Sequence, residues 1–175
     1  MFTNFYKDPD QSEESGFAFA SNTTLHGKRY VGYFSDNVSW FDTATLHGDT
    51  NDTTQINNFS SNAELYSWMW FGYFYAPTAG NYTFYTSSDD ASYAWIGENA
   101  ASGYTTGNAT VNNGGLHGAR ETSGTIYLAE GYHALRIMFG EYTGGDYITF
   151  SFAGPGITKT TNGSGYFFGG EEAWE

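Results

Sequence analysis

Short runs of aromatic and β-branched residues, separated by breaks that contain glycine or proline, recur along the chain. The clearest pair is Trp68–Tyr75 and Asn81–Thr86, and the segment between them, Ala76-Pro-Thr-Ala-Gly80, has the residues of a turn. This pattern predicts a β-hairpin. A third apolar run, Tyr93–Ile96, follows the second strand after a short acidic break.

The same pattern predicts the other elements. The run Tyr66–Tyr75 is apolar without alternation, which fits a strand buried on both faces. Two polar stretches, Asp42–Asn62 and Gly97–Ala119, are predicted to be long loops. A second hairpin is predicted around Glu130-Gly131. Further strands are expected at Gly16–Ala20, Arg29–Phe34, Gly124–Ala129, His133–Phe139, Tyr147–Phe152 and Gly165–Phe168.

Composition supports an all-β fold and narrows the possible partners. The chain has 175 residues, which fits one domain over residues 1–175, with 20% aromatic residues and 23 glycines. Its formal net charge is −13, from 19 acidic against 6 basic residues, so nucleic acid and anionic lipid are poor partners. The absence of cysteine excludes disulfides and thiolate metal sites. No apolar stretch is long enough to insert across a membrane.

Two neighbouring carboxylates, Asp89 and Asp90, stand at the end of the second predicted strand. Neighbouring side chains of a regular strand point to opposite faces, so both can serve one site only where the backbone is irregular. Ca²⁺ would suit such a site, because it takes six to eight oxygen ligands in a flexible shell. The alternative is a solvated acidic turn.

Other polar residues are weaker candidates. The segment Gly140-Glu-Tyr-Thr-Gly-Gly-Asp146 is rich in glycine, which permits tight backbone paths and exposes carbonyl oxygens to a cation. A second calcium site through Asp49 and Asp52 is conceivable, although the EF-hand spacing is missing. His117 is either a turn histidine or a hydrogen-bonding group for a sugar or a ligand loop, and Asn112 has the same two alternatives, a structural role or a binding one.

Two long segments, GYFYAPTAGNYTFYTSSDDASYAWIG and GTIYLAEGYHALRIMFGEYTGGDYITFSF, resemble the signatures of the protective-antigen-type (PA-fourteen) domains, a class that includes the GLEYA adhesins and yeast flocculins. The resemblance covers the chain from about Tyr30 to Phe168. It implies a two-sheet antiparallel β-sandwich with long loops rich in glycine and asparagine. In the family's lectin members the Asp-Asp pair is joined by a cis peptide bond and binds Ca²⁺, which contacts vicinal sugar hydroxyls. The matching residues here are Asp89 and Asp90.

The resemblance also implies the remaining ligands. The family's second metal loop corresponds to the glycine-rich segment, where Glu141 stands at a position that is Asn in flocculin-type members. A carboxylate there would raise the charge of the site and its calcium affinity. Fungal members of the family usually carry disulfides, so the absence of cysteine favours a bacterial or phage source. The implied metal ligands are Asp89, Asp90, Glu141, Thr143, Gly145 and Asp146, and the implied sugar contacts are Asp89, Asp90, Glu141, Tyr142, Thr143, Gly144 and Asp146.

These features together predict a calcium-dependent lectin domain of an extracellular surface adhesin, which binds cell-surface glycans or polysaccharides as a monomeric module of a larger exported protein. Two alternatives keep the fold: a non-catalytic carbohydrate-binding module of a glycoside hydrolase, and a structural or protein-binding module that calcium stiffens. An enzyme is not expected, because carboxylates that grip Ca²⁺ stay ionised and no serine-elbow, zinc, P-loop or dinucleotide motif is present.

Overall fold

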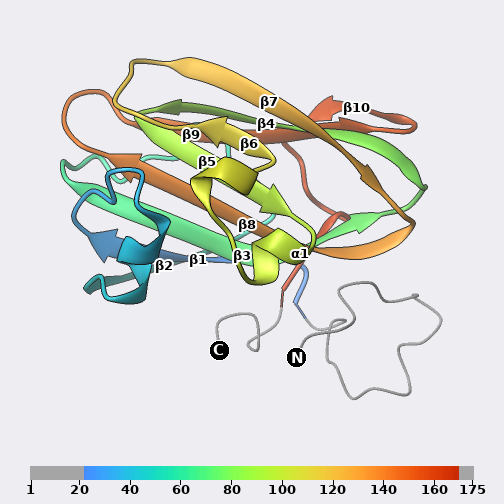
Figure 1. The fold of residues 1–175 in the computed structure, drawn as a ribbon, viewed down its shortest axis with the longest axis horizontal. Coiled ribbons are helices and arrows are strands. Elements are labelled where there is room, and N and C mark those ends of the chain that lie inside the picture. The colour runs from blue at the N-terminus through green and yellow to red at the C-terminus, as the bar shows by residue number, and fades with distance from the viewer. Residues whose placement is uncertain (1–21, 170–175) are drawn as a thin grey trace.

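A computed structural model describes residues 22–169, which form two stacked antiparallel sheets (Figure 1). The larger sheet has seven strands in the order β2-β1-β3-β8-β5-β6, with β11 also pairing with β3, and the smaller has four in the order β10-β9-β4-β7. The strands are β1 (Leu25–Val31), β2 (Leu46–Thr53), β3 (Tyr66–Ala76), β4 (Gly80–Asp89), β5 (Ala91–Ile96), β6 (Val111–Asn113), β7 (Arg120–Leu128), β8 (Gly131–Glu141), β9 (Tyr147–Gly154), β10 (Ile157–Thr160) and β11 (Phe167–Phe168). The predicted two-sheet antiparallel β-sandwich is therefore confirmed.

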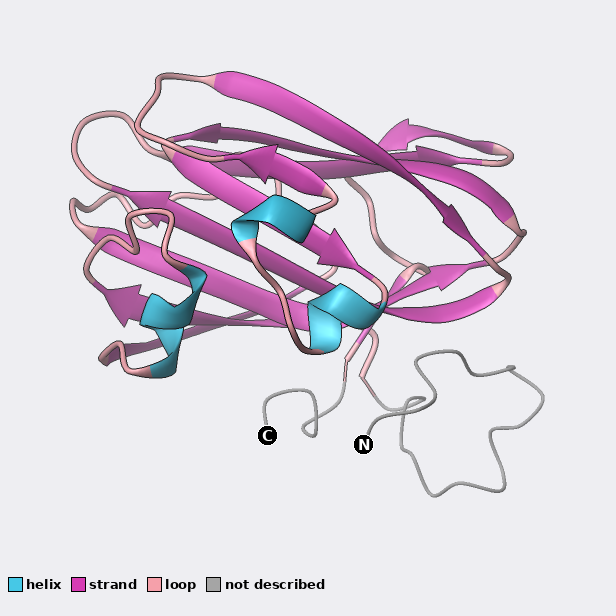
Figure 2. Ribbon diagram, in the orientation of Figure 1, coloured by secondary structure: helices cyan, strands magenta, loops and turns pink. Residues whose placement is uncertain are grey.

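The larger sheet is covered on both faces. Along β3, Trp70 and Phe74 point into the core between the sheets, while Met69 and Phe71 belong to a second apolar cluster on the outer face. That outer cluster lies under short helical segments, among them α1 (Glu98–Ala101), which Figure 2 shows in cyan. The prediction of a strand buried on both faces is confirmed. Within residues 22–169 no helix has the length and apolarity needed to cross a bilayer.

The smaller sheet has one face in the core and one facing solvent. Along β4, Tyr82 and Phe84 are fully buried, whereas Thr83 lies on the outer face with its hydroxyl 2.8 Å from that of Thr125 on β7. This alternation is the period-two pattern expected for an antiparallel strand with one solvated face.

Both predicted hairpins are wrong, because each turn joins strands of different sheets. The Ala76–Gly80 turn connects β3 in the larger sheet to β4 in the smaller one, and the Glu130-Gly131 turn connects β7 to β8. Turn residues mark a reversal of the chain but do not specify which neighbour the next strand pairs with. Placing the two strands in different sheets buries their aromatic faces against each other, which favours this arrangement over pairing the strands in one sheet.

The two predicted loops contain short regular elements, and some boundaries shift. Asp42–Asn62 contains the strand β2, which is mostly exposed and is held by its ladder to β1 rather than by apolar side chains. Gly97–Ala119 contains α1, the 3₁₀ helix Thr106–Asn108 and β6. The strand predicted at Arg29–Phe34 lies earlier, at β1. The strand predicted at Gly16–Ala20 falls outside the described residues.

Two further connections between the sheets meet at one end of the sandwich, on the left in Figure 1. The chain leaves β4 at Asp89 and enters β5 at Ala91, and it leaves β8 at Glu141 and enters β9 at Tyr147. In the larger sheet Ala91 lies opposite Gly140, and in the smaller sheet Asp89 lies opposite Tyr147. The strand pairing therefore places the Asp-Asp pair beside the 141–146 segment.

Candidate functional site

Three acidic side chains converge where these two connections meet. Asp89, Asp90 and Glu141 each offer a carboxylate oxygen, and these oxygens lie within 4.8 Å of one another. Asp90 and Glu141 are buried, and Asp89 is partly exposed. The structure thus brings together the three acids at the centre of the predicted ligand set, and does so with the strand ends of both sheets.

Backbone donors hold Asp90 in place. The N–H of His117 donates to its Oδ1 at 3.0 Å, and the N–H of Tyr142 donates to its Oδ2 at 3.0 Å. The peptide bond between Asp89 and Asp90 is cis, as the family resemblance implies. Both predicted site loops therefore contact the Asp-Asp pair directly.

Glu141 is the most unusual residue of the group. It is 0% exposed, and neither of its carboxylate oxygens has a hydrogen-bond partner among the described residues. Buried polar atoms are nearly always paired in folded proteins, because an unpaired one costs its full desolvation energy. A cation bound between the three carboxylates would satisfy both oxygens.

The charges of the group interact strongly. Burial, with the negative charges of Asp90 and Asp89 next in size, raises the pKa of Glu141 from 4.5 to about 8. Burial and the charge of Asp90 also raise the pKa of Asp89, while the nearby His117 acts in the opposite direction. Three carboxylates at this spacing favour either protonation or a positive charge between them, and an all-oxygen set of this kind suits a hard divalent cation such as Ca²⁺.

The 142–146 loop is hydrogen-bonded to Glu64 and Leu65, the two residues directly before β3. The N–H of Leu65 donates to the carbonyl of Tyr142 at 3.0 Å, and the N–H of Gly144 donates to the Glu64 carboxylate at 2.9 Å. A Cβ on Gly145 would lie 3.4 Å from Asp89 Oδ2, so this loop borders the carboxylate group closely. The roles of the Thr143 and Gly145 carbonyls as ligands remain predictions.

Asp146 lies next to the three-carboxylate group without belonging to it. Its Oδ2 accepts hydrogen bonds from the hydroxyls of Ser60 and Tyr66. It is near enough for its charge to raise the pKa of both Asp89 and Glu141. Its predicted roles as metal ligand and sugar contact remain predictions.

A buried polar network behind Asp90 was not anticipated. The Ser88 hydroxyl donates to the Asp90 carbonyl at 2.7 Å and lies 2.7 Å from the hydroxyl of Ser92. Asn113 is fully buried, donates to the Arg120 carbonyl and accepts from its Nε. Sequence reasoning singled out the neighbouring Asn112, which is exposed. Alternation with the buried Val111 was the signal that would have identified Asn113 instead.

Tyr33 forms part of the rim and was also missed. Its ring lies 5.8 Å from that of Tyr142 in an edge-to-face arrangement, and Tyr142 is 46% exposed. Burial and the charges of Asp36, Asp90 and Glu141 raise the pKa of the Tyr33 phenol, which places it beside the acidic group. No local pattern in the sequence distinguishes it from the other tyrosines.

The remaining candidates have structural partners. The ring nitrogens of His117 lie 2.8 Å from the carbonyl of Gly118 and 3.0 Å from that of Asn113, in keeping with the turn-histidine alternative. Asp49 pairs with Arg29 and Asp52 with His26. Among residues 22–169 the only group of three or more acidic or histidine ligands is the one described above, so a second site at Asp49 and Asp52 has no support.

Comparison with known proteins gives a family and several structural relatives. A family model described as the GLEYA domain matches residues 66–154, just over half of the 175-residue chain, and this stretch includes all three carboxylates. No curated protein sequence matches the chain.

Among solved structures, a PA14 sugar-binding domain from an RTX adhesin has a TM-score of 0.69 at 16% identity and covers 86% of this chain and 100% of its own. The Epithelial Adhesin 6 A domain from Candida glabrata, in complex with Galb1-3GlcNAc, has a TM-score of 0.65 at 15% identity, with 85% and 88% covered. An anti-sigma factor domain-containing protein has a TM-score of 0.67 at 17% identity, and the chain spans 49% of its length. At these identities the likeness concerns the fold.

Proposed function

The chain belongs to the GLEYA domain family, and from this premise we propose that it is a non-catalytic, calcium-dependent carbohydrate-binding domain of the adhesin type. The observation that carries the proposal is the buried Glu141 carboxylate, which has both oxygens unpaired within the described residues and lies against Asp89 and Asp90. The relatives support the ligand class, since one is a sugar-binding domain and another holds a disaccharide.

Asp89, Asp90 and Glu141 would hold the ion, with the carbonyls of Thr143 and Gly145 completing its shell. Bound Ca²⁺ would supply coordination positions that two neighbouring sugar hydroxyls fill in place of water. The N–H groups of His117 and Tyr142 keep Asp90 oriented.

The rim of the site would select among sugars. Tyr142 is exposed next to the ligand Glu141, and Gly144 lies in the same loop. Tyr33 packs against Tyr142, so the two rings would offer aromatic surface to the apolar face of a sugar. Asp146 would accept a hydrogen bond from a sugar hydroxyl.

Affinity for a single sugar should be weak, with a Kd on the order of 0.1 to 10 mM, because a monosaccharide offers few atoms. Several copies on one surface would raise the effective concentration and make attachment stable. We therefore place the domain in a larger exported, extracellular protein that binds cell-surface glycans or polysaccharides.

A glycan array probed with the purified domain in millimolar Ca²⁺, and again with EDTA, tests the proposal. We expect binding to glycans that share a vicinal-diol sugar, lost with EDTA and lost in Asp90→Ala. Glu130→Ala is the matched control, because it removes an exposed carboxylate in the turn between β7 and β8, at the opposite end of β8 from Glu141. Array binding by Asp90→Ala equal to the parent domain would place the sugar site elsewhere.

Two alternatives predict different results. A calcium-stiffened structural or protein-binding module predicts that calcium raises the Tm while free sugars leave it unchanged. A carbohydrate-binding module of a glycoside hydrolase predicts the same array result as the adhesin, and the flanking domains of the parent protein distinguish the two.

A further inference from the structure

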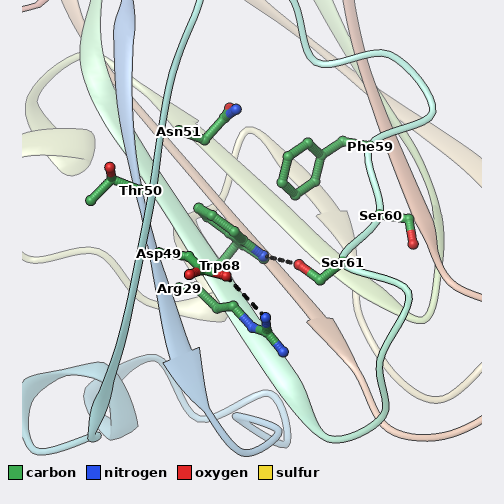
Figure 3. A pocket seen from close by; sticks show the side chains of 8 residues that line it. All are labelled: Arg29, Asp49, Thr50, Asn51, Phe59, Ser60, Ser61 and Trp68. Atoms are coloured by element: carbon green, nitrogen blue, oxygen red, sulfur yellow. Dashed lines mark hydrogen bonds and ion pairs between the residues drawn. The ribbon is translucent and has the colours of Figure 1, made fainter.

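A groove of about 330 Å³ opens on the inner face of the larger sheet, outside the acidic site. Figure 3 shows Asp49 and Asn51 of β2 along one side, Phe59 and Ser61 of the following segment along the other, and Trp68 of β3 between them. The groove has the size of a sugar residue rather than of a single water or ion.

The groove contains a charged pair with unused hydrogen-bonding capacity. Arg29 donates from Nη1 to Asp49 Oδ2 at 3.1 Å, and its side chain is 14% exposed while that of Asp49 is 55% exposed. The Nε of Arg29 is buried and has no hydrogen-bond partner within residues 22–169. Because this atom is buried, a ligand in the groove would instead accept from the exposed part of the Arg29 side chain.

The rest of the lining combines aromatic surface with fixed polar groups. The Trp68 indole N–H donates to the Ser61 hydroxyl at 2.8 Å, and the Phe59 ring meets Trp68 edge-to-face with centroids 5.0 Å apart. Asn51 accepts from the Trp70 indole at 3.0 Å, which fixes the orientation of its amide. These contacts hold the lining rigid before any ligand arrives.

We propose that this groove binds one neutral sugar residue without calcium. A sugar hydroxyl both donates and accepts, so it can donate to the exposed Asp49 carboxylate and accept from Arg29 at once. The apolar face of the ring can lie against the aromatic lining. An anionic ligand is disfavoured, because Asp49 already neutralises Arg29 and the whole chain carries a net charge of −13.

The groove lies close to the acidic site but shares no ligand carboxylate with it. Ser60, which also lines the groove, hydrogen-bonds Asp146, and Arg29 lies over the ring of Tyr66, which contacts the same Asp146. The choice of a sugar as ligand rests on the proposed function, whereas binding in the groove needs no metal. The two claims can therefore fail separately.

The direct test is NMR titration of the ¹⁵N-labelled domain in EDTA with methyl glycosides of glucose, galactose and mannose, N-acetylglucosamine, and glucuronate as the charged counterpart. We expect at least one neutral sugar to shift the side-chain N–H signals of Arg29 and Trp68 in a saturable way, with glucuronate weaker. The same shifts should occur in Asp90→Ala, in which the calcium site is disabled.

Two variants assign the binding to the groove. Asp49→Asn removes the carboxylate acceptor, and Arg29→Lys removes the guanidinium donors while keeping the charge, so each should weaken sugar binding about tenfold. Asp52→Asn is the matched control, since it makes the same change on the same strand outside the groove. A thermal melt checks that Arg29→Lys is folded. Asp49→Asn should fold like the parent domain, because the Asp49 side chain is exposed.

Failure of all five sugars to shift Arg29 and Trp68 at tens of millimolar, or equal affinities in Asp49→Asn and Asp52→Asn, would overturn the groove proposal. Saturable NMR shifts in EDTA, together with glycan-array binding that is the same with and without calcium, would support sugar binding in the groove and reject the calcium site.

Discussion

Without calcium, the domain should lose stability as the pH rises, and Glu141 is the residue responsible. The folded state holds this carboxyl in a buried site beside two other acids, which raises its pKa to about 8, whereas an ordinary glutamate ionises near 4.5. Between these two values the folded state binds more protons than the unfolded state. The free energy of unfolding therefore falls as the pH increases through this window.

The size of the effect follows from the shift. A pKa difference of about 3.5 units corresponds to about 5 kcal/mol at most. The site opens toward solvent at the partly exposed Asp89, so screening by water reduces this to about 2 to 3 kcal/mol. For a domain of this size such a loss lowers the Tm by about 5 to 10 °C.

The assay is a set of thermal melts in EDTA from pH 5 to pH 8, on the parent domain and on Glu141→Gln. The Tm of the parent should fall between pH 4.5 and pH 8, because the stability that protonated Glu141 contributes is fully present below pH 4.5 and lost above pH 8. The Tm of Glu141→Gln should change much less with pH. Glu121→Gln, an exposed residue paired with Lys159, should behave like the parent. Calcium at 100 times its Kd should restore about 2.7 kcal/mol to the parent at pH 8.

A parent Tm that stays level or rises between pH 5 and pH 8 in EDTA would refute the reasoning, because an ionised Glu141 would then carry no cost in the folded state. The same slope in Glu141→Gln as in the parent would assign the effect to other groups. Asp89, whose pKa is also raised, contributes the residual slope expected in the variant.

Two further predictions concern the surroundings of the site. Asn113→Ala should lower the free energy of unfolding, measured by urea denaturation, by about 2 to 3 kcal/mol, because it leaves buried donors and acceptors unpaired. The control Asn112→Ala changes an exposed residue and should alter this free energy by less than about 0.5 kcal/mol. Equal losses in the two variants would contradict the buried network. Gly124→Ala should cost about 3 kcal/mol or more, since a Cβ there would lie 1.7 Å from the Thr110 carbonyl oxygen, whereas Gly107→Ala has only an ordinary contact at 3.9 Å and serves as its control.

Much of the fold could be predicted from the aromatic and glycine pattern, because strands buried on one or both faces leave a direct trace in the sequence. The burial of Tyr66–Ala76 on both sides is an example. What the pattern could not predict is which sheet a strand joins, since pairing depends on contacts distant in sequence. The pattern also did not predict the edge strand Leu46–Thr53. This strand is held by backbone hydrogen bonds to β1, and its side chains are mostly exposed and polar, so they leave no apolar pattern in the sequence.

The centre of the candidate site could be predicted, but its supports could not. Asp89 and Asp90 are visible as an acidic pair at a strand end, and Glu141 was reached through family resemblance. Tyr33 and Glu64 come from other parts of the chain and have no motif of their own. Only the folded arrangement brings their side chains to the 141–146 segment.

The division between strand ends and loops implies a division of labour within the site. Asp89 and Glu141 are the last residues of β4 and β8, and Asp90 lies between β4 and β5, so the spacing of the three carboxylates is set by the two sheets. The residues that would face a sugar, Tyr142 and Gly144, lie in a loop whose backbone groups are held by Leu65 and Glu64. Changing loop side chains can therefore alter which sugar is bound while the ion stays in place, because the contacts that orient Asp90 come from backbone N–H groups, which any residue except proline provides.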